Sequence, residues 1–192
     1  MKSNRRKFLQ YSGLTGISLA VANMMKGFGA NTNDTPVAAL SHLDKTHSQH
    51  FNMCGYAAPK LEKVRIGFIG LGNRGPGAVE RMSHIDGVEI KALCDIRPEK
   101  VSAVKKTLEG SSHQPAIYTN KEDEWKKLCE SPDIDLVYIA TPWSMHTPMA
   151  VYAMDHGKHV CVEVPAAKTI KECWQLVETS ERNRKHCMML EN

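Results

Sequence analysis

The sequence predicts an α/β fold, a doubly wound parallel sheet with helices on both faces. Three observations lead to this prediction: an apolar stretch that runs directly into closely spaced glycines (64–75), a second apolar stretch that ends on an acidic residue (88–95), and an alternation of strand-like and helix-like patterns from residue 61 onward. Strands that alternate with helices through short connections are typical of parallel sheets built from βαβ units.

The first strand, expected at 64–70, leads into the spacing G-x-G-x-x-G at Gly70, Gly72 and Gly75. In dinucleotide-binding folds the first glycine allows a tight turn, the second lets the backbone approach a pyrophosphate, and the third lets the next helix pack closely. The helix N-terminus then offers free N–H groups and a partial positive charge to the phosphates. The pattern predicts a dinucleotide site, against the alternative of a glycine-rich turn without a ligand.

The second strand ends on Asp95, roughly 20 residues after the glycines, as the dinucleotide-binding pattern requires. Further along, the continuous apolar run at 136–140 is typical of a central strand, Pro98 suits a first helical turn, and Gly157 suits a helix end. Six strands with five crossovers complete a Rossmann NAD-binding domain at 61–192 with strand order 3-2-1-4-5-6. The expected strands are 64–70, 88–95, 116–119, 136–140, 159–164 and 187–190, and the expected helices are 77–85, 98–108, 122–129, 147–156 and 170–185.

The net charge of +4 is concentrated at the N-terminus. Residues 1–30 hold five basic residues and no acidic one, and the remainder has 20 basic against 21 acidic residues. A nucleic-acid surface would show clustered Lys and Arg, so we expect no nucleic-acid partner.

The stretch from Ser3 to Gln10 contains an arginine pair followed by Lys-Phe-Leu, and it resembles a twin-arginine export signal. We expect residues 1–30 to be a signal peptide and the protein to be periplasmic, cell-surface or secreted; the alternative is a basic arm that is retained. The apolar run at 13–25 is shorter than the roughly 20 residues of a membrane-spanning helix, so no span is expected. Residues 31–60 lack a sustained period and predict a linker with solvated histidines, and no metal site is expected.

In doubly wound sheets, ligands bind beyond the carboxyl ends of the strands, near the switch point between strands one and four. The backbone amides of Asn73 and Arg74 are therefore expected to face the phosphates. Asp95 is placed to accept hydrogen bonds from the adenosine ribose, which favours NAD because a 2′-phosphate would be repelled. The nearby Arg97 weakens this inference, since a basic residue there can accommodate NADP.

Two side chains that follow the fourth strand each have more than one possible role. Trp143 could stack on a flat ring, and His146 could carry a proton or form hydrogen bonds. The alternatives are an aromatic residue at a helix start and a histidine that caps the helix.

Three spaced motifs at 140–146, 156–160 and 163–165 resemble the superfamily of glucose–fructose oxidoreductases and inositol dehydrogenases. Its members carry A-T-P-x-x-x-H, A-G-K-H-V and E-K-P in these places, and the resemblance spans residues 64–192. One departure is informative, because Val164 stands where the family has lysine. In the dehydrogenases that lysine helps to handle the substrate hydroxyl proton, so its loss argues against simple alcohol dehydrogenation.

The stretches 141–143, 163–167 and 186–192 are similar in detail to glycoside hydrolase family 109, NAD-dependent α-N-acetylgalactosaminidases of the same superfamily. The resemblance implies hydrolysis of terminal α-linked N-acetylgalactosamine on glycans, by an NAD-dependent cycle of oxidation, elimination, addition and reduction. Catalytic residues are expected beyond Asn192, in an α+β substrate domain that we expect to be missing from this chain, which alone would be inactive. The implied cofactor contacts, besides the three glycines, are Asn73, Arg74, Asp95, Trp143, Ser144, Met145, His146, Glu163, Val164 and Asn192.

Two other functions stay open. An exported sugar oxidoreductase with tightly bound NAD(P) would pass hydride between two sugars, but it should retain the lysine that Val164 replaces. A catalytically silent NAD-binding or sugar-sensing protein is the second alternative. The formation of a homo-oligomer is left open.

Overall fold

The structure is a computed structural model that describes residue 49 and residues 51–191. The expected signal peptide at 1–30, most of the expected linker at 31–60, and Asn192 lie outside the described residues. Within 51–60 the chain forms neither helix nor strand. Phe51 and Tyr56 of this segment nevertheless pack on the domain: the Arg184 guanidinium lies 4.7 Å from the Phe51 ring centre, and the Tyr56 and His186 ring centres are 5.3 Å apart.

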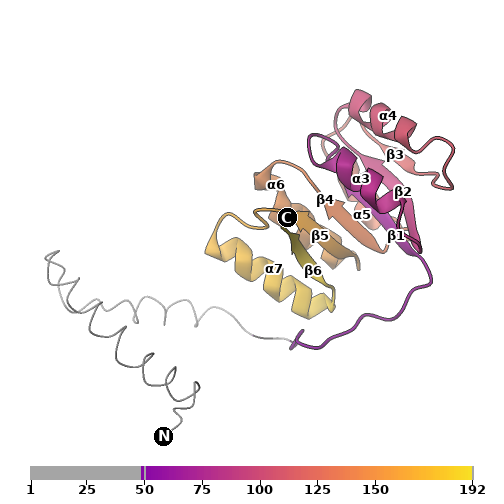
Figure 1. Ribbon diagram of the computed structural model, residues 1–192. Helices are drawn as coiled ribbons and strands as arrows, with labels where there is room; N and C mark the ends of the chain where they lie inside the picture. The colour runs from indigo at the N-terminus through magenta and orange to yellow at the C-terminus, as the bar shows by residue number, and fades with distance from the viewer. Residues whose placement is uncertain (1–48, 50, 192) are drawn as a thin grey trace, which may run out of the picture. The chain divides into compact units, whose positions relative to one another are not determined.

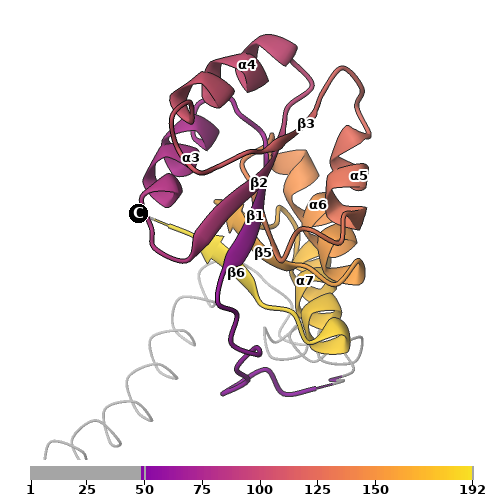
Figure 2. The same cartoon turned by 90° about the vertical axis from the view of Figure 1, so that its right-hand side faces the viewer.

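The centre of the domain is a six-stranded parallel sheet of order β3-β2-β1-β4-β5-β6 (Figures 1 and 2). This is the predicted doubly wound order, which is thereby confirmed. All five strand pairs are parallel, and β1 pairs with both β2 and β4. The strands are β1 (Val64–Ile69), β2 (Val88–Cys94), β3 (Ala116–Tyr118), β4 (Leu136–Ile139), β5 (His159–Glu163) and β6 (Cys187–Leu190).

Helices cover both faces of the sheet, and the two layers are separate in Figure 2. One apolar core joins α3 and α4 to the side of the sheet that carries Phe68 and Ile90. The other joins α5, α6 and α7 to the side that carries Ile69 and Val137. Because strand side chains alternate between faces, one apolar run supplies both cores. The helices are α3 (Gly75–Ser83), α4 (Pro98–Thr107), α5 (Glu124–Glu130), α6 (Trp143–Asp155) and α7 (Ile170–Asn183).

Three helix starts differ from the prediction, and two of them bring site residues into helices. The helix α5 begins at Glu124 and not at 122. The helix α3 begins at Gly75 and not at 77, so the third glycine of the motif is its first residue. The helix α6 begins at Trp143 and not at 147, with Pro148 inside it, where the missing N–H removes one backbone hydrogen bond. His146 therefore lies in the first turns of α6.

Candidate functional site

The glycines Gly70 and Gly75 are required by the packing of the protein itself. Gly70 has a φ of +93°, and a Cβ atom there would lie 2.5 Å from the carbonyl oxygen of Ala140. A Cβ atom on Gly75 would clash with the carbonyl oxygen of Gly70. The tight turn after β1 and the close approach of α3 thus depend on the absence of side chains, as the motif predicts.

Gly72 differs from its two neighbours in the motif. A Cβ atom at this position would meet only the Arg97 guanidinium, at an ordinary contact distance of 3.5 Å. Nothing in the protein therefore excludes a side chain at Gly72. A backbone that must be approached by a ligand gives a reason for glycine there, and this open surface fits the dinucleotide pyrophosphate.

The start of α3 leaves its backbone amides available. Arg74 occupies the N-cap position, and neither a side-chain cap nor an acidic residue in the first turn competes for the N–H groups. Asn73 and Arg74 are exposed on the loop that leads into this helix. An uncapped N-terminus with an adjacent guanidinium suits an anion such as a phosphate.

Asp95 follows β2 and joins two loops of the site. Its carboxylate accepts hydrogen bonds from Leu71 N (2.8 Å), Arg97 N (3.0 Å) and Arg97 Nε (3.2 Å). Burial would raise the pKa of Asp95, but the amides of Arg97 and Leu71 and the Arg97 guanidinium outweigh it and hold this pKa below its usual range. Asp95 thus holds the glycine loop against the loop after β2, and its expected bond to a ribose hydroxyl stays a prediction.

Thr119, directly after β3, is a candidate site residue that the sequence did not indicate. Its hydroxyl oxygen is buried and has no hydrogen-bond partner, the single side-chain atom of this kind in the described part of the chain. The preceding Tyr118 accepts a hydrogen bond from Asp95 N, which places Thr119 beside the Asp95 loop. Buried polar groups are normally paired, so an unpaired hydroxyl at this edge is consistent with a ligand-binding surface.

The start of α6 presents one exposed aromatic ring and one buried imidazole. Trp143 is 62% exposed, and Ser144 beside it is exposed as well. His146 is 1% exposed; its Nδ1 lies 2.8 Å from the carbonyl oxygen of Pro165 and its Nε2 lies 2.8 Å from that of Thr141. Because carbonyl oxygens only accept, a neutral ring satisfies one of these contacts at a time and the doubly protonated ring satisfies both.

His146 therefore ties the turn after β4 to the turn after β5. Between the two possible roles, this arrangement favours hydrogen bonding over proton transfer to a ligand. Met145 is half-buried against the core, so its side chain adds to the packing of the same turn.

The end of β5 carries Glu163 and Val164, both half-buried. Glu163 accepts a hydrogen bond of 2.6 Å from the hydroxyl of Tyr138, a β4 residue that the sequence did not single out. Val164 precedes Pro165 and offers no group that exchanges a proton. Glu163 is the residue at this turn whose side chain can accept hydrogen bonds from a ligand.

The lysine of the 156–160 motif lies away from this edge. Lys158 precedes β5 and is buried, and its Nζ donates to the carbonyl oxygens of Ser131 (2.6 Å) and Ile134 (2.9 Å). Burial lowers the pKa of this lysine. These contacts fix the loop before β4 at the amino ends of the strands, so the motif contributes to folding at this position.

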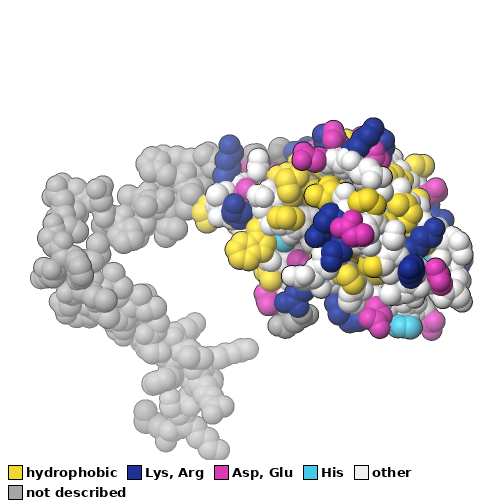
Figure 3. All heavy atoms as spheres, turned by 90° about the horizontal axis from the view of Figure 1, so that it is seen from above, with side chains coloured by type: hydrophobic (Ala, Val, Ile, Leu, Met, Phe, Trp, Pro, Cys, Tyr) yellow, Lys and Arg dark blue, Asp and Glu magenta, His cyan; other side chains and the backbone are white. Residues whose placement is uncertain are grey.

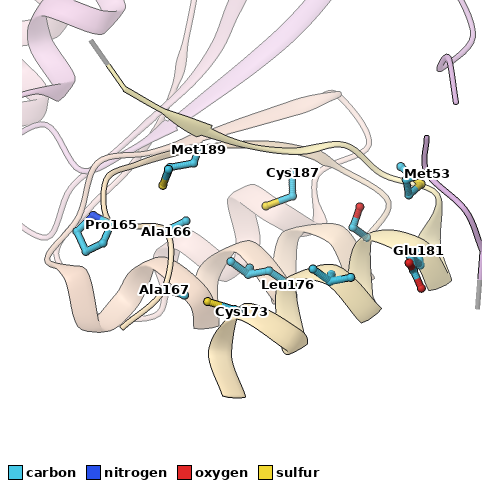
Figure 4. A pocket seen from close by; sticks show the side chains of 11 residues that line it. Met53, Pro165, Ala166, Ala167, Cys173, Leu176, Glu181, Cys187 and Met189 are labelled. Atoms are coloured by element: carbon cyan, nitrogen blue, oxygen red, sulfur yellow. The ribbon is translucent and has the colours of Figure 1, made fainter. Parts of the chain in front are cut away.

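A hollow of about 420 Å³ lies between α7 and β6. Figure 4 shows Cys173 and Leu176 of α7 facing Cys187 and Met189 of β6, with Pro165 at one end and Met53 at the other. Its lining is mainly apolar, and it contains none of the motif glycines. We therefore place the candidate site at the carboxyl ends of the strands, where the polar groups converge, and not in this hollow.

Charges are mixed on the face of the domain drawn in Figure 3, where acidic, basic and hydrophobic side chains are interspersed. None of the helices in the described residues has the length and apolar character needed to cross a membrane. The same residues contain no group of three or more His, Cys, Asp or Glu that could hold a metal ion.

Comparison with known proteins identifies the family of the domain. Residues 64–191 match the model of a family described as an oxidoreductase family with an NAD-binding Rossmann fold. Glycosyl hydrolase family 109 protein 1 of Bacteroides thetaiotaomicron is 62% identical over 93% of this chain and 38% of its own length. An α-N-acetylgalactosaminidase of Bacteroides fragilis is 56% identical over 77% of this chain and 35% of its own length.

A scyllo-inositol dehydrogenase from Lactobacillus casei, solved with NAD(H) and scyllo-inositol, shares the fold. It has a TM-score of 0.58 and 22% identity, and the match covers 66% of this chain and 36% of the dehydrogenase. The resemblance to family 109 is confirmed by the two Bacteroides proteins, although this chain spans well under half the length of either. By its match over 64–191, the chain belongs to the oxidoreductase family with the NAD-binding Rossmann fold.

Proposed function

We propose that the whole protein is an NAD-dependent glycosidase that releases terminal α-linked N-acetylgalactosamine from glycans. The observation that carries this proposal is the 56% identity over 149 residues to an α-N-acetylgalactosaminidase. The chemistry that NAD supplies when bound is reversible oxidation of the sugar, which acidifies the neighbouring C–H bond and permits loss of the C1 substituent.

The residues of this chain would bind and orient the cofactor. Gly72 leaves the backbone open to the pyrophosphate, and the uncapped start of α3 with Arg74 provides amides and a positive charge. Asp95 holds the glycine loop in place. Trp143 provides an exposed aromatic surface after β4, the strand that pairs with β1, and a flat ring could stack there.

Val164 leaves the turn after β5 without a group that can take or return the proton of a sugar hydroxyl. Oxidation of the sugar requires removal of that proton, whether the oxidation is net or is reversed within each turnover. We propose that the groups that carry out these proton transfers lie beyond Asn192.

Export in the folded state is part of the same proposal. The arginine pair at 5–6 precedes Lys-Phe-Leu, and a protein that leaves the cytoplasm has no external pool of NAD to exchange with. An enzyme that restores its cofactor in every turnover needs no such pool, provided that the cofactor is bound before export. We also propose that residues 31–60 link the signal to the domain.

The test is an assay of the full-length protein with an α-linked chromogenic N-acetylgalactosaminide and no added NAD. Release of the sugar without net reduction of bound NAD is the expected result. Net reduction of NAD by a free sugar, with no release, would instead identify a sugar oxidoreductase. Absence of both reactions in a protein shown to bind NAD would leave the non-enzyme function.

A further inference from the structure

The hydrogen bond between Tyr138 and Glu163 joins the interior of the sheet to its carboxyl edge. In the parallel pairing of β4 and β5, Tyr138 lies opposite Cys161, so Glu163 is two residues further toward the edge. Residues two apart on a strand share a face, which puts Glu163 on the side of Tyr138. The hydroxyl therefore reaches along the sheet to the last residue of β5 and donates to Glu163 Oε1 at 2.6 Å.

The donor of this bond is rigid. Tyr138 is 3% exposed, and its ring stacks on fully buried Phe68 with 5.2 Å between ring centres and 29° between planes. Burial raises the pKa of Tyr138, and the hydrogen bond to Glu163 and its negative charge raise it further. The positive charge of Arg81, from α3, acts in the opposite direction and is outweighed. The hydroxyl consequently stays protonated and remains a donor.

The acceptor is held at one oxygen only. Among the described residues, the carboxylate of Glu163 has no other hydrogen bond, and the side chain is half-buried at the end of its strand. Oε1 is fixed by the tyrosine, so within the described part of the chain Oε2 is left to accept a bond from a ligand. One oxygen bound and one free is the arrangement expected of a carboxylate that is oriented for a ligand.

The pair is not needed to fill the core. Phenylalanine at 138 would keep the stacking on Phe68, and the half-buried Glu163 carboxylate that loses its bond can be hydrated, so we expect only a small loss of stability. A polar pair that packing does not require, located where ligands bind, favours a role in binding.

We propose that Tyr138 is a positioning residue, whose hydroxyl orients Glu163 so that its free oxygen accepts a hydrogen bond from the nicotinamide half of the cofactor. The donor on the cofactor is a ribose hydroxyl or the amide N–H. Both groups donate a hydrogen bond, which is what the carboxylate recognises. This inference rests on the proposed function in that it takes NAD as the ligand.

The experiment compares NAD binding to the full chain and to Tyr138→Phe by isothermal titration calorimetry. We expect Tyr138→Phe to weaken binding about tenfold, the effect of losing one well-oriented hydrogen bond, while the thermal unfolding midpoint falls by no more than a few degrees. The matched control is Tyr152→Phe. Tyr152 on α6 also donates to a glutamate, Glu130 of α5, but this pair lies away from the carboxyl edge, so NAD affinity should not change.

A double-mutant cycle tests whether Tyr138 acts through Glu163. Glu163→Ala should weaken binding at least as much as Tyr138→Phe, and adding Tyr138→Phe to Glu163→Ala should have no further effect. A merely structural tyrosine would weaken binding equally in both backgrounds, which would overturn the inference. If Tyr138→Phe does not fold, the test depends on Glu163→Ala. Unchanged NAD affinity of that variant would overturn the inference.

The outcomes separate this inference from the proposed function. If the unmodified chain does not bind NAD, the proposed function and the role of Tyr138 fall together. If it binds NAD and Tyr138→Phe binds equally well, only the role of Tyr138 is wrong.

Discussion

The two halves of the carboxyl edge differ in how far their carboxylates are already bonded within the protein. On the β1–β2 half, the carboxylate of Asp95 accepts three hydrogen bonds, and Gly70 and Gly75 are packed against backbone. On the β4–β5 half, Trp143 is largely exposed and Glu163 accepts one hydrogen bond among the described residues. In the proposed function, the first half is preformed for the phosphates, whereas the second keeps groups available for the part of the cofactor at which chemistry occurs.

This comparison predicts that substitutions of the groups already packed or bonded on the first half, Gly75 and Asp95, act mainly on stability. Gly75→Ala should have the largest effect, because the new Cβ atom would clash with the Gly70 carbonyl, which belongs to the backbone and cannot rotate away. We expect the free energy of unfolding to fall by about 3 kcal/mol or more, measured by urea denaturation.

Gly77→Ala is the matched control in the same helix. A Cβ atom there would meet only the Arg81 guanidinium, which is the end of a flexible side chain. Alanine is the better helix former, so this variant should be as stable as the unmodified chain or more stable by up to about 1 kcal/mol. Equal losses for Gly75→Ala and Gly77→Ala would contradict the packing role of Gly75.

A smaller effect is expected for Asp95→Asn. The amide keeps the shape but not the charge, so the bonds from Leu71 and Arg97 weaken, and stability at pH 7 should fall by about 1–2 kcal/mol. The pKa of Asp95 is lowered in the folded state, so its contribution is present above the unfolded pKa of about 3.9 and is lost as the pH falls through the folded pKa.

The stability difference between the unmodified chain and Asp95→Asn should therefore be constant near neutrality and shrink in acid. Urea midpoints measured from pH 7 downward would show this. Asp123→Asn is the control, because that side chain is 71% exposed. A difference that persists unchanged at the lowest pH would mean that the charge of Asp95 is not what holds the two loops.

The smallest effect on stability is expected for Gly72→Ala, on the same half of the edge. Its Cβ atom fits beside Arg97, so the unfolding free energy should change by less than about 0.5 kcal/mol. The affinity for NAD should nevertheless fall, since the methyl group occupies the surface that the pyrophosphate approaches. Titration calorimetry with NAD measures this, and unchanged affinity would show that Gly72 does not face the cofactor.

The sequence was sufficient for features that depend on local patterns. The alternation of strands and helices predicted the sheet order, and the glycine spacing predicted the loop after β1. The start of α6 was predicted four residues too late. The contacts of His146 with Thr141 and Pro165, which accompany a helix that begins at Trp143, are not contained in the local pattern.

Features that depend on register between strands could not be predicted. The bond from Tyr138 to Glu163 requires that β4 and β5 be adjacent and that Tyr138 lie opposite Cys161, and no local pattern contains that information. Thr119 was missed for a related reason. That its buried hydroxyl has no hydrogen-bond partner can be seen only when the positions of the atoms around it are known.

The position of β1 in the sheet has a consequence for the time at which the domain forms. The strand pairs with β2 on one side and with β4 on the other, and Arg65 of β1 is bonded to Asp135, 70 positions later in the chain. At a synthesis rate of about 5–20 residues per second, β4 follows β1 from the ribosome by roughly 4–14 s. During that interval one side of β1 has no partner strand, so the growing chain exposes an apolar strand edge for seconds. Protection by a chaperone in that interval would therefore matter more for this domain than for one built from local contacts.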